Sequence, residues 1–546
     1  MRRLFLFLIA LPVFMPLAGC GGGNGSSTPP PPVTPQPSVT MSFTPGTVAA
    51  GQPATLTWSS SKVTSCAASG SWSDAQLTSG ALTFVDVAPG NYSFTLTCTG
   101  NYGSAATTAS VTVTSATSQV TAPLPGPPAA CASNCYYVDA VNGSDQNNGR
   151  TPSTAFQTLQ MAANTVGPGA TVTVMSGTYT AADGGWLTLS TSGTPSAWIR
   201  FIAGAGQHPI VQTSSSSWAW YGIQITGSYI VIDGFEVAGH NQSITAAQVG
   251  NGDPNSGLFN QACVGLNGGS GAIPHDIVVR NSILHDCGQS GFGVSVGDAI
   301  TVAYNTVYNN SWWTWYDSSG ISLWHLVDVP GSTVTNGYKN FIVGNVAYNN
   351  YNNVPSWALN PPGVTDGNAI IIDDNRHTGA SSGANDPQNV PYTGRTYIAN
   401  NIVYSNGGRG IIAGTSAHVD IANNTTYNNM LTDSPYIVVG EINAPNSYDV
   451  NVVNNIADNL NGKQVDETDG GTYLNNLWDG SNVPMLGANG LSQDPGFTNA
   501  AAGNFTPAAG SPALGSGTAA LAPIIDIAGQ ARPATAIDRG AIQVSQ

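Results

Sequence analysis

A short acidic run follows an apolar stretch in DGNAIIIDDNRHTG, residues 366–379. It brings Asp366, Asp373 and Asp374 together in a chain of which only 8% of the residues are charged. Neighbouring carboxylates can bind Ca²⁺ through their oxygens. Alternatively, their mutual repulsion raises one pKa and provides the acid and the base that a glycosidase needs. A third interpretation is a solvated turn in which Asp373, Asp374 and Asn375 hydrogen-bond to the nearby backbone.

The segment AIIID, residues 369–373, predicts a strand that ends at the acidic run. Side chains alternate between the two faces of a strand, so Ile370 and Ile372 share one face and Ile371 and Asp373 share the other. If the first pair points into a core, Asp373 points outward and Asp374 begins the following turn.

Two arginines and a glutamate extend this set of candidate catalytic residues. Arg409 lies between glycines in GGRG, where it could pair with Asp373 or Asp374 or bind a uronate carboxylate through two hydrogen bonds. Arg395 is a second candidate for assistance, and Glu441 could extend the acidic row. The predicted catalytic residues are Asp373, Asp374, Asp366, Arg409 and Arg395, and the three aspartates are also the candidate Ca²⁺ ligands.

Aromatic residues crowd the segment SWWTWYDSSGISLWH, residues 311–325. Aromatic rings stack on the apolar faces of sugars, whereas the alternative is that they pack this segment onto the rest of the fold. We expect both roles to be represented. The candidate substrate-binding residues are Trp315, Tyr316, Trp324, His325, Arg376, His377 and Glu441.

A unit of β-branched residues followed by asparagine recurs through the second half of the chain, centred on Asn281, Asn305, Asn345, Asn401, Asn424, Asn455 and Asn476. Its short steps of 24, 23 and 21 residues are typical of one coil of a β-solenoid. We expect asparagine at turn positions that need a left-handed backbone, with its side chain hydrogen-bonded to the backbone or to stacked neighbours.

Two longer steps in this repeat, of 40 and 56 residues, coincide with the aromatic and acidic segments. Extra residues in a solenoid form loops that project from its face. Because consecutive coils lie about 4.8 Å apart, loops from adjacent coils can line one groove.

Composition restricts the class of partner. The chain has 546 residues, enough for two or more domains, and its 65 glycines and 35 prolines favour strands and turns. A formal net charge of −16 argues against nucleic acid, since phosphate binding requires clustered Lys and Arg.

Residues 1–19 have two arginines followed by an apolar run, which is typical of a signal peptide. The end of this segment, LAGC, resembles a bacterial lipobox, which implies cleavage before Cys20 and its acylation; an ordinary signal peptide is the alternative. Gly21 favours outer-membrane sorting in that pattern. Residues 20–38 then form a Gly/Ser- and Pro-rich tether, so we expect a lipid-anchored protein at the bacterial outer membrane or cell surface.

Residues 39–115 alternate like short strands separated by turns, as in ATLTWSS and NYSFTLTCTG. This block resembles the Ig-like modules of secreted bacterial proteins, which implies a sandwich stapled by Cys66 and Cys98 and filled by Trp58. It could be a spacer or a binding module. Residues 116–133 are a linker. An oxidising compartment permits disulfides in the other local pairs, Cys131 with Cys135 and Cys263 with Cys287.

From residue 134 the opening YYVDAVNGSDQNNGRTPSTAFQTLQMAANTV is similar to that of right-handed parallel β-helix proteins of the pectate-lyase-like superfamily. The resemblance covers residues 134–546 and implies an all-β fold. It also implies that TAFQTLQMAANTV is a capping helix with Ala155, Leu159, Met161 and Val166 at its apolar positions. The C-terminal segment resembles those that close such helices.

Family lyases perform β-elimination with Ca²⁺ and a Lys or Arg, but only Lys339 and Lys463 occur in this domain, and we find no full lyase site. Hydrolysis by two carboxylates, Asp373 with Asp374, Asp366 or Glu441, is therefore a variant within the same class. The sequence predicts an enzyme that cleaves a polysaccharide by one of these reactions. A non-catalytic glycan-binding or adhesive surface protein is the alternative.

Overall fold

The structure is a computed structural model that describes residues 36–87, 89–114, 119–181, 185–268, 272–356, 359–378, 390–466, 471–480 and 486–544, with the side chains of 464–466 excepted. The expected signal peptide, Cys20 and most of the tether lie outside these residues. No described helix is long and apolar enough to cross a membrane.

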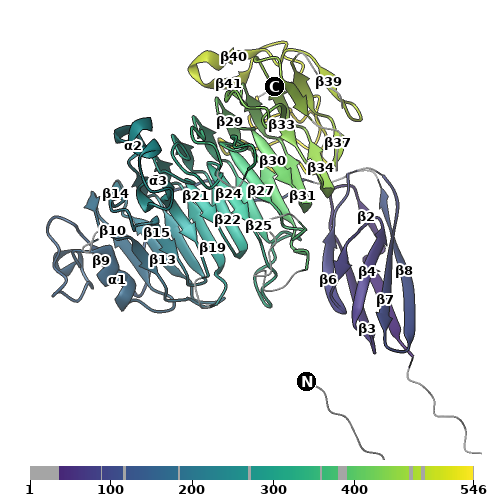
Figure 1. Cartoon of the computed structure of the whole chain (residues 1–546), viewed down its shortest axis with the longest axis horizontal. Helices are drawn as coiled ribbons and strands as arrows, with labels where there is room; N and C mark the ends of the chain where they lie inside the picture. Colours follow the sequence, from purple (N-terminus) through teal and green to yellow (C-terminus); the bar gives the residue numbers. More distant parts are fainter. Residues whose placement is uncertain are drawn as a thin grey trace, which may run out of the picture.

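Three long parallel sheets make up most of the described chain, and they form a right-handed parallel β-helix, as predicted (Figure 1). Sheet 1 contains β9 (Cys135–Val138), β10 (Thr171–Val174), β13 (Ile199–Ala203), β16 (Ile230–Asp233), β19 (His275–Arg280), β22 (Asp298–Ala303), β25 (Asn340–Val343), β28 (Thr396–Ala399), β31 (Ala417–Ala422), β34 (Tyr448–Val453) and β37 (Gly471–Leu474). Sheet 2 contains β11 (Gly177–Tyr179), β14 (Pro209–Gln212), β17 (Glu236–Ala238), β20 (Ile283–His285), β23 (Thr306–Tyr308), β26 (Val346–Tyr348), β29 (Ile402–Tyr404), β32 (Thr425–Tyr427), β35 (Ile456–Asp458), β38 (Leu477–Asp479) and β39 (Leu491–Ser492). Sheet 3 contains β12 (Leu187–Leu189), β15 (Tyr221–Ile225), β18 (Ala262–Leu266), β21 (Phe292–Val294), β24 (Ile321–Trp324), β27 (Ile370–Asp373), β30 (Ile411–Gly414), β33 (Val439–Asn443) and β36 (Gln464–Asp466).

The core of the β-helix follows from alternation within each strand. On β27, Ile370 and Ile372 belong to the central apolar cluster, whereas Ile371 lies on the outer face. The same positions on β24 place Ile321 and Leu323 inside. Each coil therefore buries its β-branched and leucine side chains against the coils above and below it.

Two columns of buried asparagines run through the turns between the sheets. In one, each side-chain amide donates to the next at 2.9–3.0 Å, in the order Asn305, Asn345, Asn401, Asn424, Asn455 and Asn476. The left-handed residue of each turn is the one before the column asparagine, such as Tyr304 or Asn400. The expectation that the column asparagines themselves are left-handed was therefore wrong. Asn281 is left-handed, but it precedes Ser282, whose amide donates to the first column asparagine, Asn305.

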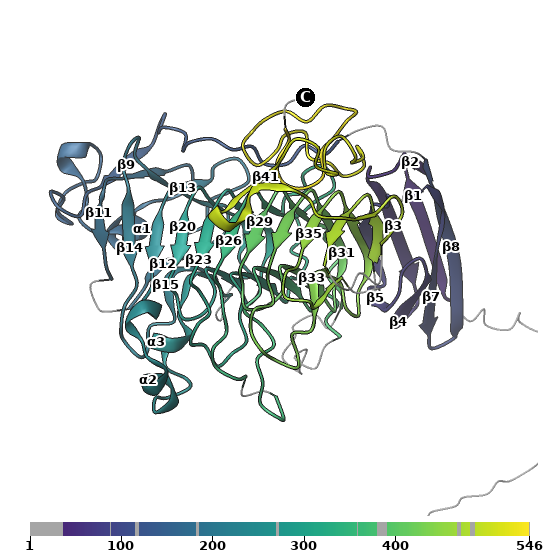
Figure 2. The ribbon, with the colours of Figure 1, turned by 90° about the horizontal axis from the view of Figure 1, so that it is seen from above.

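Helix α1 (Leu159–Thr165) covers the first coils, and it buries Leu159, Ala162 and Ala163. Thr158 caps it by accepting a hydrogen bond from the Met161 amide at 3.1 Å. At the other end, the C-terminal segment with β40 (Phe497–Asn499) and β41 (Asn504–Pro507) lies along the β-helix (Figure 2). Phe505 packs there against Tyr404, which follows His285, Tyr308 and Tyr348 in one stack of rings.

The N-terminal domain consists of two antiparallel-rich sheets. One contains β1 (Ser38–Thr44), β3 (Ala54–Ser61) and β6 (Ser79–Phe84), and the other contains β2 (Thr47–Ala49), β8 (Gly103–Thr114), β7 (Gly90–Gly100), β4 (Ser65–Gly70) and β5 (Ala75–Gln76). Trp58 is buried in its core. Cys66 and Cys98 form a disulfide between the paired strands β4 and β7, so the bond lies within one sheet and does not join the two. The Ig-like assignment stays a prediction.

This domain lies beside the C-terminal half of the β-helix (Figures 1 and 2). The linker then runs back along the β-helix, since the Asn336, Tyr304 and Asn281 side chains bond in turn to the Thr121, Pro123 and Gly126 carbonyls. The Cys131–Cys135 disulfide precedes β9, and Cys263–Cys287 joins adjacent coils inside the core. All three predicted disulfides are thus present.

Candidate functional site

An open pocket of ≈ 580 Å³ lies on the outer face of sheet 3. Three carboxylates line it, those of Asp317, Asp366 and Asp373, together with Tyr316 and Trp324. We call this the acidic pocket. In the described part of the chain, no Lys or Arg lines it.

Strand register positions the first side chains of the acidic pocket. Asp373 ends β27 on the outward face, as alternation predicts, and it pairs with Trp324 of β24 in the neighbouring coil. On its other side it pairs with Gly414 of β30, where a Cβ would lie 3.7 Å from the Asp373 Oδ1. The carboxyl therefore lies between an indole and an uncrowded glycine.

The two insertions supply the other carboxyls. Asp317 belongs to the loop between β23 and β24, and Asp366 to the loop before β27. Asp366 accepts a hydrogen bond from the Ser319 hydroxyl at 3.2 Å. Loops from adjacent coils thus meet over sheet 3, as the repeat spacing predicts.

All three carboxyls of the acidic pocket bind their protons more tightly than usual. Burial, together with the charges of Asp366, Asp374 and Asp317, raises the pKa of Asp373 to about 7. Burial and the charge of Asp317 raise the pKa of Asp366 to about 6, against the lowering influence of Arg409. Burial also raises the pKa of Asp317, opposed by hydrogen bonds from Ser356 and Thr365.

Asp317 was not among the predicted catalytic residues. It was visible in the aromatic segment between Tyr316 and Ser318, but nothing in that segment predicts which way its side chain points. It takes the place expected for Asp374, which lies behind the pocket in the turn at φ 48°. The Asp374 Oδ1 accepts from the Thr378 amide at 3.1 Å, and its Oδ2 lies 3.5 Å from the His325 Nε2.

The two predicted histidines lie in adjacent turns, His377 in the turn after β27 and His325 directly after β24. The Nε2 of buried His377 lies 2.9 Å from the Leu326 carbonyl, and its ring packs against His325. The His325 ring stacks on Trp324 at 3.8 Å. These contacts support the indole that lines the pocket.

The residues predicted to bind Ca²⁺ do not fit that role well. Asp374 points into the turn and not toward the carboxylates of Asp366 and Asp373. Among the described residues, no three His, Cys, Asp or Glu side chains are arranged to hold a metal ion. We therefore derive no catalytic step through calcium.

Arg409 lies at the start of β30, at the opposite end of the strand from Gly414. Its guanidinium donates to the carbonyls of Thr365 at 3.0 Å, Tyr436 at 2.8 Å and Val439 at 3.1 Å. It thus holds together the two loops that border Asp366, and its charge lowers the pKa of that carboxyl.

Two other predicted arginines lie at the interface with the N-terminal domain. Arg395 is fully buried, and it binds Asp449 and the Val85 carbonyl. Arg376 binds Asp74 of the N-terminal domain through two hydrogen bonds of 2.9 Å. Neither side chain lines the acidic pocket.

Glu441 points inward from β33 and is fully buried. It accepts hydrogen bonds from the Asn429 backbone and side chain at 2.8 and 2.7 Å, and burial raises its pKa to about 7. It ends the second asparagine column, which consists of Asn310, Asn350, Asn406 and Asn429. The structure therefore places Glu441 apart from the acidic row.

An excursion between β17 and β18 contacts Tyr316 at the edge of the acidic pocket. It contains α2 (Ala246–Gly250) and α3 (Gly257–Asn260), which project from the β-helix in Figure 2. Trp315 packs into an apolar cluster with Phe259, whereas the hydroxyl of Tyr316 donates to Asn255. Trp315 is thus a packing residue and Tyr316 lines the pocket. The asparagine repeat in the sequence begins at Asn281, so it does not predict this earlier excursion.

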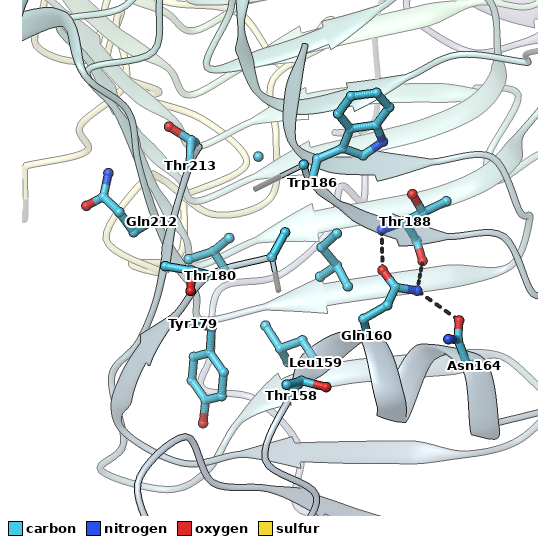
Figure 3. A pocket seen from close by; sticks show the side chains of 15 residues that line it. Thr158, Leu159, Gln160, Asn164, Tyr179, Thr180, Trp186, Thr188, Gln212 and Thr213 are labelled. Carbon is cyan, nitrogen blue, oxygen red and sulfur yellow. Dashed lines mark hydrogen bonds between the residues drawn. The ribbon is translucent and has the colours of Figure 1, made fainter. Parts of the chain in front are cut away.

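A second pocket, of ≈ 480 Å³, lies at the first coils (Figure 3). Leu159 of α1 lies on one side of it and Trp186 and Thr188 on the other, where the Gln160 side chain bonds to the Thr188 backbone. No carboxylate lines this pocket within the described residues, so it lacks the acid–base groups of the acidic pocket.

Comparison with known proteins gives similarity in fold. No family model matches the chain, and no curated protein matches its sequence. The solved structures that resemble it include pectate lyase Pel9A, with a TM-score of 0.44 and 16% identity over 75% of this chain and 96% of that one. A rhamnogalacturonan lyase has a TM-score of 0.39 and 18% identity, and the match covers 63% of this chain and 87% of that one. A GH136 lacto-N-biosidase from Eubacterium ramulus has a TM-score of 0.35 and 14% identity, and the match covers 64% of this chain and 55% of that one.

Proposed function

We propose that the protein hydrolyses glycosidic bonds of a polysaccharide at the acidic pocket. The observation that carries the proposal is the convergence of Asp317, Asp366 and Asp373, with raised pKa values, beside Trp324 in one open pocket. Two carboxyls in different protonation states are the groups that glycoside hydrolysis requires.

We assign the roles from the causes of the two pKa shifts, because the charge of Arg409 favours ionised Asp366, whereas three neighbouring carboxylates favour protonated Asp373. Asp373, at about 7, keeps its proton longest and is the general acid, whereas Asp366, at about 6, is mostly ionised at neutral pH and is the general base. Asp373 gives its proton to the leaving glycosidic oxygen as the bond to the anomeric carbon breaks. Asp366 takes a proton from the water whose oxygen bonds to that carbon, and exchange with solvent restores both groups.

The charge of the pocket favours hydrolysis over β-elimination. Elimination requires a cation that neutralises a uronate carboxylate, yet Arg409 is bound to three carbonyls and Lys339 to Asp298 and Asp328. No described Lys or Arg side chain lines the pocket, so the ionised carboxylate of Asp366 repels an acidic sugar. The geometry therefore supports a neutral glycan as substrate.

The test is incubation of the protein with neutral and uronate polysaccharides, with and without EDTA, at pH values from 4 to 9. We expect new reducing ends without unsaturated uronate. The activity should have a pH optimum between about 6 and 7, and its fall on either side should report the coupled titration of Asp366 and Asp373. Asp366→Asn and Asp373→Asn should each abolish activity. Asp494→Asn, the same change at an exposed carboxylate after β39, is the control.

The outcomes separate the alternatives. EDTA-sensitive formation of unsaturated uronate would favour calcium-assisted elimination instead. Binding of a polysaccharide without cleavage would favour the glycan-binding or adhesive function. Full activity of Asp373→Asn would contradict the assigned acid.

We propose further that a lipid on Cys20 anchors the protein at the outer membrane, which the pattern LAGC and the following tether support. In a bacterial host that performs this modification, Cys20→Ser should move the protein from the membrane fraction to the soluble fraction. An unchanged membrane fraction would contradict the anchor.

A further inference from the structure

A cluster of aromatic side chains lies at the end of sheet 3 away from Asp373. The ring of Trp186 lies 5.7 Å from those of both Trp218 and Tyr221, and its Nε1 donates to the Gln224 side chain at 2.9 Å. Trp218 is nevertheless 50% exposed. An indole that only completes internal packing would not need so large a solvent-facing surface.

Tyr221 connects this cluster to the acidic pocket, because its side chain also lines that pocket. Its ring lies directly over Gly265, where a Cβ would come within 2.5 Å of the ring. Its hydroxyl accepts a hydrogen bond from the Asn267 side chain at 3.1 Å. The tyrosine is thus held flat against the sheet.

Small residues occupy one outward row of sheet 3, between Gln224 of β15 and Ile371 of β27. Gly265, Gly293 and Ser322 follow one another in register on β18, β21 and β24. They form a shallow floor with larger side chains at both ends, and we call the outer face from Trp218 to Asp373 the groove. From β15 to β27 it spans four steps between coils, about 19 Å at the usual strand spacing.

We propose that Trp218 and Tyr221 form a sugar-binding subsite at the end of the groove away from Asp373, so that the protein binds an extended neutral polysaccharide along the groove and prefers long chains to short ones. The preference for cleaving long chains rests on the proposed function, whereas the binding of sugar at this subsite does not. The polar groups at this end, Gln224 and Asn267, are uncharged hydrogen-bonding amides that suit sugar hydroxyls.

The experiment measures binding and cleavage of soluble xylan, mannan, glucan and galactan, and of the disaccharides of the same sugars, by the full-length wild type and Trp218→Ala. Loss of the aromatic ring should raise the Kd and the KM for the bound polymer about tenfold. Affinity for the matching disaccharide at the acidic pocket and kcat on the polymer should stay within about twofold.

Two further variants serve as controls. Trp218→Tyr retains a ring and should retain most of the affinity. Trp198→Ala removes a tryptophan that packs on Tyr229 outside the groove, and it should leave binding of the polymer unchanged.

The results distinguish the two proposals. Unchanged polymer binding by Trp218→Ala, with activity still lost in Asp373→Asn, would overturn the subsite and leave the hydrolase intact. Weaker polymer binding by Trp218→Ala in a protein that cleaves nothing would support the subsite and overturn the hydrolase. Failure of the wild type to bind any of the four neutral polymers would overturn the subsite.

Discussion

Replacement of Asp373 by asparagine should stabilise the protein at alkaline pH while it abolishes activity. The folded protein holds the Asp373 proton with a pKa of about 7, whereas the ordinary value is 3.8. Below about pH 4 the carboxyl is protonated in both the folded and unfolded chains. As the pH rises to about 7, the unfolded chain loses this proton first, so the folded state becomes relatively less stable.

The size of the effect follows from that difference. A rise from 3.8 to about 7 corresponds to roughly 4 kcal/mol of unfolding free energy above pH 7. Because the carboxyl borders an open pocket, water screens part of its charge, and we expect about half of this gain. Asparagine carries no proton to lose, so Asp373→Asn should be more stable than the wild type by about 2 kcal/mol at pH 8.

Calorimetric unfolding of the wild type and Asp373→Asn at pH 4 and pH 8 measures the effect. The melting temperature of the variant should exceed that of the wild type at pH 8 and match it at pH 4, whereas Asp494→Asn should show no such difference. A rise in melting temperature of the same size at both pH values, or a fall at pH 8, would refute the view that ionised Asp373 destabilises the folded protein.

Three further substitutions test the scaffold. Asn401→Ala should lower the free energy of unfolding by about 3 kcal/mol in denaturant titration, because the backbone and side-chain N–H groups of Asn345 lose their buried acceptor and the Asn424 Oδ1 loses one of its two donors; a cost below 1 kcal/mol would show that the column is dispensable. Replacing Cys263 and Cys287 together by serine should lower the free energy of unfolding by about 3 kcal/mol, because the disulfide closes a segment of 24 residues and so restricts the unfolded chain. If the wild type is equally stable with and without reductant, the disulfide does not make this contribution. Arg376→Ala should increase hydrogen exchange around Asp74 with little effect on activity, and unchanged exchange there would mean that this ion pair does not hold the N-terminal domain.

Local patterns predicted the parts of the fold that depend on local rules. Alternation in AIIID placed Ile370 and Ile372 inside and Asp373 outside, and the spacing of asparagines revealed the coils. The spacing could not show that the left-handed residue precedes the column asparagine, because both positions are often asparagine. Asn423 and Asn424 illustrate this ambiguity.

The candidate site was predicted less completely, because it depends on contacts between distant segments. Arg376 is bound by Asp74, 302 residues earlier, and this pairing removes it from any groove. Glu441 looked like the next member of an acidic row, but its strand turns the side chain inward. Asp317 reached the pocket through the path of a loop, which no period in the sequence describes.

The second asparagine column has a direction. Every amide from Asn310 to Asn429 donates toward the later coils, and Asn459 donates back toward the earlier ones, so both meet at Glu441. An ionised carboxylate accepts hydrogen bonds from both sides and donates none, so it is a natural terminus where amide chains of opposite polarity meet. Coils inserted before Asn429, each with an asparagine at the column position, would leave the hydrogen bonds at Glu441 unchanged. In this way such a protein could gain coils during evolution without changes at the end of the column.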